Sequence, residues 1–486
     1  MTATALPYAP REVVEEKGLI NIGLVKAHII VGFMFAIIGM LMGVFYSLQL
    51  TNLYPFPGIE WLAAGRVRMV HTNGVAYGFL LNVFLAGLYW AVPRLTKRRV
   101  LNDKLGWLIF WVYLFIVLWA VVGLLSGHAQ AVEWGETPSA FAANGTWLFP
   151  IDELVMVGLI LIAIQFLVPI FQFGSKNPMY VSLWYFTVAF IWVIFVYAMG
   201  NYLPEFIPGA GGATFVGLYI HDLVGLLITP WGWGLMYFFV PALLKRPIWS
   251  HAVSLLGFWG LAFFYPLQGV HHFLYSTIPM FAQYGAVVST VAIEVMVVTV
   301  FINFFMTLRG RETAPVKNMP IRWFYTGMVF YVITCIQCSM HVQLWAQEFI
   351  HFTDWVVGHA HLIMLGTFGF WLTGITVDLW PRVWGKTRWW SPTLHEASFW
   401  MSTIGLASMF IALTAAGLVE GFLWRGLAPW EVSLQSVRLI WMFRTATGLL
   451  ILFGYILFVY NMYMTARVPE AEFKAEEGKA IAVAVS

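Results

Sequence analysis

Long apolar segments separated by short polar ones run through almost the whole sequence. A run of about 20 apolar residues is long enough to cross a bilayer as an α-helix. We therefore expect an all-α membrane protein in which residues 1–486 form one domain, with polar cytoplasmic tails at residues 1–22 and 467–486. The pattern predicts a bundle of twelve transmembrane helices, at residues 24–50, 69–93, 105–127, 149–174, 180–199, 213–243, 249–273, 280–308, 320–348, 353–380, 395–424 and 434–465.

Basic residues collect in the segments that follow even-numbered helices, and this asymmetry predicts the orientation of the chain. The remaining segments contain few Lys or Arg, with Arg66, Arg68 and Arg425 as the exceptions. Because loops rich in Lys and Arg stay in the cytoplasm, both termini are expected there too. The residues of the basic face are Arg94, Lys97, Arg98, Arg99, Lys104, Lys176, Lys245, Arg246, Arg309, Arg311, Lys317, Arg322, Arg382, Lys386 and Arg388.

Composition agrees with a membrane protein and narrows its chemistry. The chain is 60% hydrophobic and 10% charged, whereas a soluble domain is about 25% charged. Lipid is the expected surrounding, and no nucleic-acid partner is expected. Cys335 and Cys338 lie in one apolar segment, so a disulfide framework is excluded and simple helix packing is expected for both. Since no CxxCH motif occurs, any haem would be held non-covalently.

Histidines form the most informative group of polar residues in the predicted helices. Six of them fall in the outer third of four helices when helices are counted alternately outward and inward. Ionisable residues inside a bilayer are costly and mark functional sites, and neutral imidazole is a common metal ligand. A layer of metal ligands is therefore expected. The six are His71, His221, His271, His272, His359 and His361.

The spacing of these histidines predicts how they divide among metals. His359 and His361 point about 200° apart on a helix, so each would bind a different metal. His271 and His272 could share one metal if the helix end is distorted, with His221 as a third ligand. Three histidines with an open position are typical of a reactive metal centre. We expect three metals, one of them bound by His71 and one of the pair on the tenth helix.

The other histidines receive simpler interpretations. His28, His251 and His395 map to the cytoplasmic rim, where they are expected to cap helices or face headgroups. His128 and His351 lie in or near outer loops and receive the same interpretation. His341 falls at nearly the same membrane depth as the six histidines. It is a candidate for a residue that contacts the metal ligands without binding a metal itself. A proton-coupled transporter with a histidine relay is the alternative class, although it does not explain why acids are nearly absent from the layer.

The stretches around the six histidines resemble the catalytic subunit of haem-copper oxygen reductases, most closely the cbb3-type cytochrome c oxidase subunit I. The resemblance covers roughly residues 60–390. The segments that carry it are GRVRMVHTNGVAYGF, HDLVGLL, KRPIWSHAVSLLGFWGLAFFYPLQGVHHFLY and FIHFTDWVVGHAHLIMLG. Their order and spacing, and the twelve-helix core, agree with that family.

The resemblance implies a role for each ligand. His71 and His361 look like the axial pair of a low-spin haem b, and His359 looks like the proximal ligand of a high-spin haem b. His221, His271 and His272 look like the ligands of a copper ion that faces the high-spin haem.

The resemblance also assigns residues around the metals. Tyr265 resembles the tyrosine that this subfamily links covalently to a copper-ligand histidine, and helix rise puts it about 9 Å deeper than His271. Ser254 and Tyr331 resemble members of a cytoplasmic proton path. Arg66 and Arg68 are expected to pair with haem propionates. Glu133 and Glu136, in VEWGE, look like an acidic pair beside the propionates that also holds calcium.

Two positions decide between members of this superfamily. Nitric oxide reductase replaces copper with non-haem iron and adds a glutamate four residues after the first metal-ligand histidine. That position is Gly225 here, which favours an oxidase. Gln337 stands where the cbb3-type pattern has a glutamate, and a neutral amide cannot strengthen the proximal imidazole as a carboxylate would. A higher potential of the high-spin haem is therefore expected.

Together these features predict a respiratory terminal oxidase in a bacterial inner membrane. It would be an oxidoreductase that reduces O2 to water, with proton uptake and translocation. Electrons are expected from cytochrome c through c-type cytochrome subunits of the same complex, because this chain has no covalent haem site. A nitric oxide reductase large subunit is the alternative.

Overall fold

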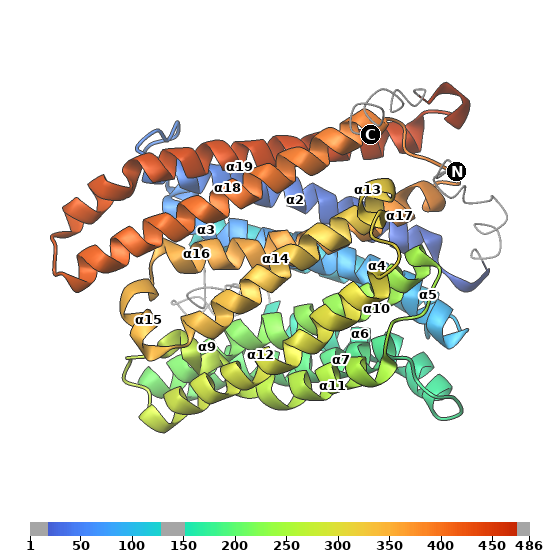
Figure 1. The fold of residues 1–486 in the computed structure, drawn as a ribbon, viewed down its shortest axis with the longest axis horizontal. Coiled ribbons are helices and arrows are strands. Elements are labelled where there is room, and N and C mark those ends of the chain that lie inside the picture. The colour runs from blue at the N-terminus through green and yellow to red at the C-terminus, as the bar shows by residue number, and fades with distance from the viewer. Residues whose placement is uncertain (1–17, 128–150, 474–486) are drawn as a thin grey trace.

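A computed structural model describes residues 18–127 and 151–473 of the protein. These residues contain twelve helices that are long and apolar enough to span a membrane, and no β-strand (Figure 1). The predicted number of helices is thereby confirmed. The spans are Ile22–Leu50 (α2), Ala64–Thr96, Asp103–Ser126 (α5), Ile151–Gly174 (α6), Val181–Asn201 (α7), Gly209–Leu244, His251–Phe273, Met280–Leu308 (α12), Met319–His341 (α14), Asp354–Val383, Pro392–Arg425 (α18) and Trp430–Arg467 (α19).

Four spans are composite. They consist of α3 (Ala64–Asn73), η2 (Gly74–Leu81) and α4 (Asn82–Thr96); α9 (Gly209–Leu223), η3 (Val224–Ile228) and α10 (Thr229–Leu244); α11 (His251–Phe264), η4 (Tyr265–Leu267) and η5 (Gly269–Phe273); and α16 (Asp354–His361), η6 (Leu362–Gly369) and α17 (Phe370–Val383). The short elements outside the spans are η1 (Glu60–Leu62), α8 (Leu203–Phe206), α13 (Ala314–Lys317), α15 (Leu344–Ile350) and η7 (Glu470–Glu472).

Three of the composite spans form the interior of the bundle. The most apolar windows of Ala64–Thr96, Gly209–Leu244 and Asp354–Val383 are 89%, 89% and 94% buried, whereas those of α5 and α12 are each 33% buried. The interior spans carry His71, His221 and the pair on α16. The outer helices therefore surround these three histidine-bearing spans.

Each interior span changes from α-helix to π-helix just after its histidine. The π-helical segment η2 begins three residues after His71, η3 begins three residues after His221, and η6 begins directly after His361. π-helical turns are rare and occur frequently at functional sites. They change the direction of the residues that follow relative to the histidine of the span, and the apolar pattern contained no sign of them.

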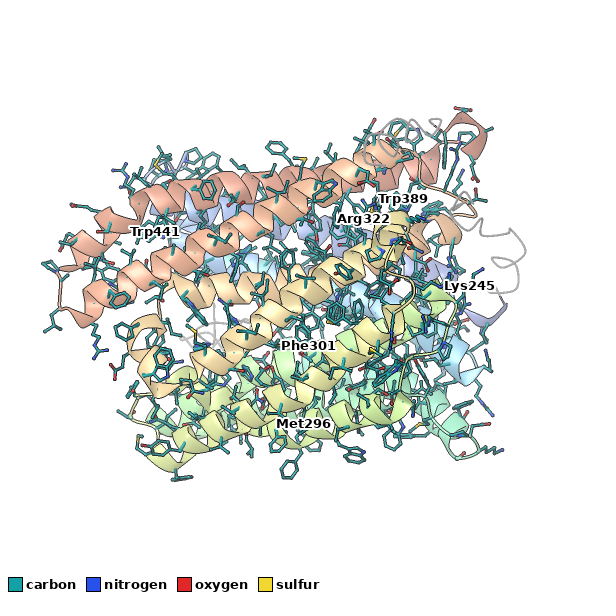
Figure 2. The ribbon with its side chains drawn as sticks, viewed as in Figure 1. Lys245, Met296, Phe301, Arg322, Trp389 and Trp441 are labelled. Carbon is teal, nitrogen blue, oxygen red and sulfur yellow. The ribbon has the colours of Figure 1, made fainter. Side chains whose placement is uncertain are left out.

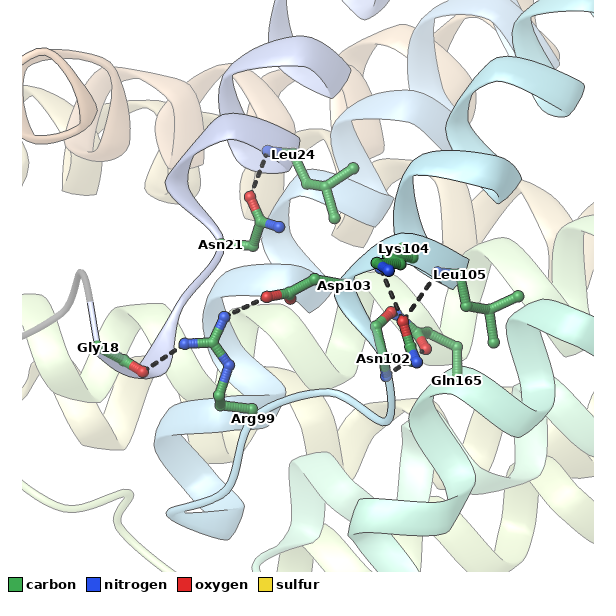
Figure 3. Close-up of polar contacts among 9 residues, drawn as sticks. All are labelled: Gly18, Asn21, Leu24, Arg99, Asn102, Asp103, Lys104, Leu105 and Gln165. Atoms are coloured by element: carbon green, nitrogen blue, oxygen red, sulfur yellow. Dashed lines mark hydrogen bonds and ion pairs between the residues drawn. The ribbon is translucent and has the colours of Figure 1, made fainter.

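Polar contacts tie the helices together at one end of the bundle. The Asn102 side chain caps α5 by accepting a hydrogen bond from the Lys104 amide at 2.7 Å (Figure 3). Gln165 of α6 bonds both backbone groups of Asn102, at 3.1 and 2.8 Å. Arg99 donates to the Gly18 carbonyl at 2.6 Å. These bonds satisfy backbone groups that a helix terminus leaves unpaired.

Two basic residues from different loops, Lys245 and Arg322, lie at the same end of the bundle (Figure 2). Lys245 and Arg322 are found toward the end of the bundle where α2 begins and α19 ends, and Trp441 is found toward the other end (Figure 2). Arg322 pairs there with Glu396 at 2.6 Å. The side of the membrane that this end faces stays a prediction.

The predicted span 320–348 is too long. The helix α14 ends at His341, and α15 follows as a separate short helix. The His341 carbonyl accepts a hydrogen bond from the Gln347 side chain in place of the backbone N–H that a continuing helix would supply.

The rim interpretation of two histidines is wrong. His28 is completely buried, its Nδ1 donates a hydrogen bond to Asn82 Oδ1 at 2.9 Å, and its ring stacks on Tyr89. His395 is 3% exposed and packs against Trp389. Their positions near helix ends were inferred from height along the helix, but height does not determine whether a residue faces lipid or the bundle. His251 is exposed, as expected.

Candidate metal centre

His221, His271 and His272 lie together although two different spans carry them. Each offers one ring nitrogen, and these three atoms are within 4.8 Å of one another. The end of the His251–Phe273 span is distorted as the shared site required. After Phe264 the α-helix gives way to the two tight turns η4 and η5, and the rings of His271 and His272 have centroids 4.7 Å apart.

Hydrogen bonds determine which nitrogens of this cluster are free for a metal. Thr290 donates its hydroxyl hydrogen to the Ala286 carbonyl, so its oxygen accepts from His271 Nδ1 at 2.9 Å and leaves Nε2 free. His221 Nε2 donates to the Gln268 amide oxygen at 3.1 Å. The remaining nitrogen of His221, Nδ1, is 3.1 Å from His272 Nε2.

This donor set fits a copper ion. Two ring nitrogens that face each other at 3.1 Å repel unless a proton or a cation lies between them, and a third free nitrogen is nearby. Neutral imidazoles are suitable ligands for copper. Thr290 and Gln268 orient the rings, as outer partners of metal ligands do. The sequence reasoning did not identify these two residues.

Tyr265 lies directly against the cluster. Its ring stacks on that of His221, with centroids 4.9 Å apart and planes 15° apart. The absence of a side chain at Gly225 makes this position possible, because a Cβ there would lie 1.5 Å from Tyr265 Cε1. The helix-rise estimate concerned only the backbone, and the ring itself reaches the level of His221.

His71 and His361 form a second group. Their rings have centroids 5.9 Å apart and planes 21° apart. His71 Nδ1 donates to the Gly39 carbonyl at 2.7 Å, and His361 Nδ1 donates to the Val357 carbonyl at 2.8 Å. Each ring therefore keeps Nε2 for an axial bond, in the tautomer that metal-ligating histidines usually adopt. The pair fits a haem iron with two imidazole ligands.

The recess for His71 is built by glycines of α2. A Cβ on Gly43 would lie 2.7 Å from His71 Nδ1. Gly39 and Gly43 form a GxxxG motif, which allows close approach of membrane helices. This motif is visible in the sequence and could have identified the partner helix of His71.

His359 is directed toward the other side of the helix. Its Nδ1 donates to Gln337 Oε1 at 3.1 Å, and its ring is stacked on Trp355 with centroids 5.7 Å apart. His361 meets His71 instead, so the two histidines of α16 belong to different groups. The Cys338 sulfur lies 3.6 Å from His359 Nε2, which places this thiol closer to the site than the packing interpretation implied.

The two arginines expected to pair with haem propionates, Arg66 and Arg68, lie on α3. Arg66 pairs with Glu60 at 2.6 Å and donates to the Leu125 carbonyl at 2.8 Å. Arg68 interacts electrostatically with His71. Glu133 and Glu136 lie outside the described residues.

The proton-path residues are buried but not joined to each other. Ser254 is fully buried and donates to the His251 carbonyl at 2.7 Å. Tyr331 is 5% exposed and packs edge-on against Phe301. The part of the chain that the structure describes contains no hydrogen bond between Ser254 and Tyr331.

Two further residues near the site, Glu294 and His351, were missed or misjudged. Glu294 of α12 lies beside the thiols of Cys335 and Cys338, and an acid within an apolar run is a recognisable sign of function. His351 is not a plain loop residue, because its Nε2 donates to the His272 carbonyl at 2.9 Å. Burial lowers the pKa of His351, and this hydrogen bond opposes the shift. His341 lies next to the ligands, as expected.

A family model described as "Cytochrome C and Quinol oxidase polypeptide I" matches residues 23–466. The chain belongs to this family. It is 30% identical to the "Cytochrome c oxidase subunit 1 homolog, bacteroid" of Bradyrhizobium diazoefficiens, over 93% of this chain and 83% of that protein. It is 28% identical to the "Cbb3-type cytochrome c oxidase subunit CcoN1" of Stutzerimonas stutzeri, over 93% and 96%. A nitric oxide reductase chain of the same organism is more distant, at 21% over 89% and 91%.

A solved structure titled as a heme-copper terminal oxidase dimer has the same fold. The TM-score is 0.74 at 15% sequence identity, with 92% of this chain and 84% of that chain covered. This likeness confirms the predicted fold. The family model and the cytochrome c oxidase relatives confirm the predicted enzyme class, a haem-copper oxidase subunit I. The family implies haem and copper as cofactors and a multi-pass bacterial membrane protein.

Proposed function

We propose that this chain is the catalytic subunit of a cbb3-type terminal oxidase that reduces O2 to water. The relationship between Tyr265, His221 and Gly225 carries this proposal. A phenol stacked on a three-histidine cluster can supply one proton and one electron where a substrate binds. The same ring occupies the space that a side chain at Gly225 would need, so the glutamate ligand of a nitric oxide reductase is incompatible with this arrangement.

The residues divide among three metals. His71 and His361 would hold a low-spin haem b, His359 a high-spin haem b, and His221, His271 and His272 a copper ion. When bound, these groups supply the electrons that cleavage of the O–O bond requires. The chain itself orients the ligands: Gly39, Val357, Gln337 and Thr290 each accept a hydrogen bond from the Nδ1–H of one imidazole.

Proton supply is assigned to residues on the inner side of the cluster. Tyr265 would donate its phenolic proton toward the cluster and be reprotonated from the cytoplasmic face. Ser254 and Tyr331 are proposed members of that route, and water would have to complete it because no direct hydrogen bond joins them in the described residues. Proton translocation would be coupled to the same turnover.

The remaining assignments complete the proposal. Electrons would come from cytochrome c through c-type cytochrome subunits. Arg66 and Arg68 would face haem propionates, and Glu133 with Glu136 would hold calcium. The chain would form one twelve-helix domain in a bacterial inner membrane, with its basic face and both termini in the cytoplasm.

Metal analysis of the purified complex tests the proposal once the iron of its c-type haems, measured from the haem c absorbance, has been subtracted. Two irons and one copper per chain are expected, together with haem b bands in the reduced-minus-oxidised spectrum and consumption of O2. Three irons without copper, and turnover of nitric oxide, would support the reductase instead. A spectrum without haem b bands would exclude both enzymes and favour the transporter.

A further inference from the structure

His341, the last residue of α14, lies between the two halves of the proposed reactive centre. Its ring centroid is 6.0 Å from that of His359 on one side. It is 5.8 Å from His271 and 6.2 Å from His272 on the other. A group held between His359 and the three-histidine cluster would therefore meet the His341 ring at its edge.

The His341 ring differs from its neighbours in its hydrogen bonding. The side chain is 4% exposed, yet its ring nitrogens make no hydrogen bond within residues 18–127 and 151–473. His71, His271, His359 and His361 each use one nitrogen to bond the protein. An imidazole N–H that has no acceptor within the chain is left unsatisfied, so the ring is suited to a partner that is not part of this chain.

The partner of His341 is not the metal of the cluster. The only group of three or more potential metal ligands among the described residues is His221, His271 and His272, and His341 falls outside it. A neutral imidazole that does not bind a metal has one N–H to donate. The complementary partner is an oxygen atom with a free lone pair.

We propose that His341 donates a hydrogen bond to an oxygen atom of the group held between His359 and the cluster. The inference rests on the proposed function. The acceptor is either a carboxylate oxygen at the edge of the high-spin haem or the oxygen substrate bound on its face, and both offer the same chemistry. His341 thus positions or polarises that group, and its backbone is held by the bond from Gln347 to its carbonyl.

Vibrational spectroscopy of the complete complex tests the proposal and separates the two acceptors. If the C–O stretch of carbon monoxide bound to the reduced enzyme shifts in His341→Phe, the acceptor is the bound substrate. A shifted propionate bending band in the resonance Raman spectrum indicates the haem edge. His341→Gln, which keeps an N–H donor, should restore part of either shift. His251→Phe is the matched control, because His251 is exposed, and it should change neither band.

The outcomes that overturn the proposal are distinct from failure of the proposed function. If the haem-loaded His341→Phe complex has both bands unchanged, His341 makes no such bond although the oxidase assignment stands. If the wild-type complex contains no haem b, both proposals fall. Should His341→Phe not assemble, His341→Met removes the donor with less change in volume, and the same two bands decide.

Discussion

Tyr265 occupies the space beside Gly225, where an added Cβ would lie 1.5 Å from Tyr265 Cε1. The same tyrosine ring stacks on His221 at a centroid distance of 4.9 Å. The two positions are therefore coupled: the ring can lie against the cluster only while position 225 has no side chain. Two sequence differences between oxidase and nitric oxide reductase thus become one steric relationship.

Gly225→Ala is expected to displace Tyr265 and abolish reduction of O2 while the low-spin haem keeps its spectrum. Overpacking of this kind costs about 1–3 kcal/mol of folding free energy. Oxygen consumption and the visible spectrum of the purified complex measure both effects. Gly158→Ala is the control, because nothing lies within 4 Å of a Cβ there. Full activity in Gly225→Ala would contradict the role of Tyr265.

His272→Ala should lose copper and oxygen reduction but keep the low-spin haem. His272 contributes one of the three converging nitrogens, whereas the pair His71 and His361 is built by other helices. Copper analysis and the reduced-minus-oxidised spectrum are the measurements. Turnover that persists would refute the ligand assignment. His251→Ala, at an exposed histidine of the same span, should behave as wild type.

Gln337→Glu should lower the midpoint potential of the high-spin haem. The Gln337 amide oxygen accepts from His359 Nδ1 at 3.1 Å, and a carboxylate in its place would make the imidazole a stronger donor to iron. The oxidised state would gain stability. A spectroelectrochemical titration tests this, with the low-spin haem as internal reference. The absence of a downward shift would show that Gln337 does not set this potential.

Arg444→Met should destabilise the bundle by about 3–5 kcal/mol, because it leaves a buried carboxylate without its partner. Arg444 Nη1 lies 3.6 Å from Asp354 Oδ1, and the two side chains are 8% and 11% exposed. Trp441 donates to the other Asp354 oxygen at 2.5 Å. Thermal unfolding of the purified complex measures the loss.

The control for this prediction is an exposed ion pair at the C-terminal end of α18. Arg425 and Glu348 are 2.5 Å apart with side chains 51% and 41% exposed, and such pairs contribute about 0–1 kcal/mol. Arg425→Met should therefore change the unfolding temperature little. Adding Asp354→Asn to Arg444→Met should recover part of the lost stability, since position 354 then carries no charge without its partner. Equal effects of both arginine variants would contradict the buried pair.

The spans and the relative directions of neighbouring histidines were predictable because both depend on residues that are close together in the sequence. Apolar length determines whether a segment can span a bilayer, so the twelve spans could be read from hydrophobicity with errors of a few residues. The error was larger at the end of α14, where the helix stops at His341 and the Gln347 side chain bonds the His341 carbonyl. The 200° separation of His359 and His361 follows from helical geometry, and these residues indeed face Gln337 and His71 respectively.

Other features depend on which helix faces which, and the one-dimensional pattern does not contain this information. The burial of His28 and His395, the three π-helical turns and the contact of Tyr265 with His221 all arise from packing between spans. The sequence by itself determined the membrane bundle and the set of histidines, because hydrophobicity and residue type are properties of single positions. Only the tertiary structure decided how these histidines group and which nitrogens stay free, because ring orientation is set by hydrogen bonds and glycine recesses on neighbouring helices.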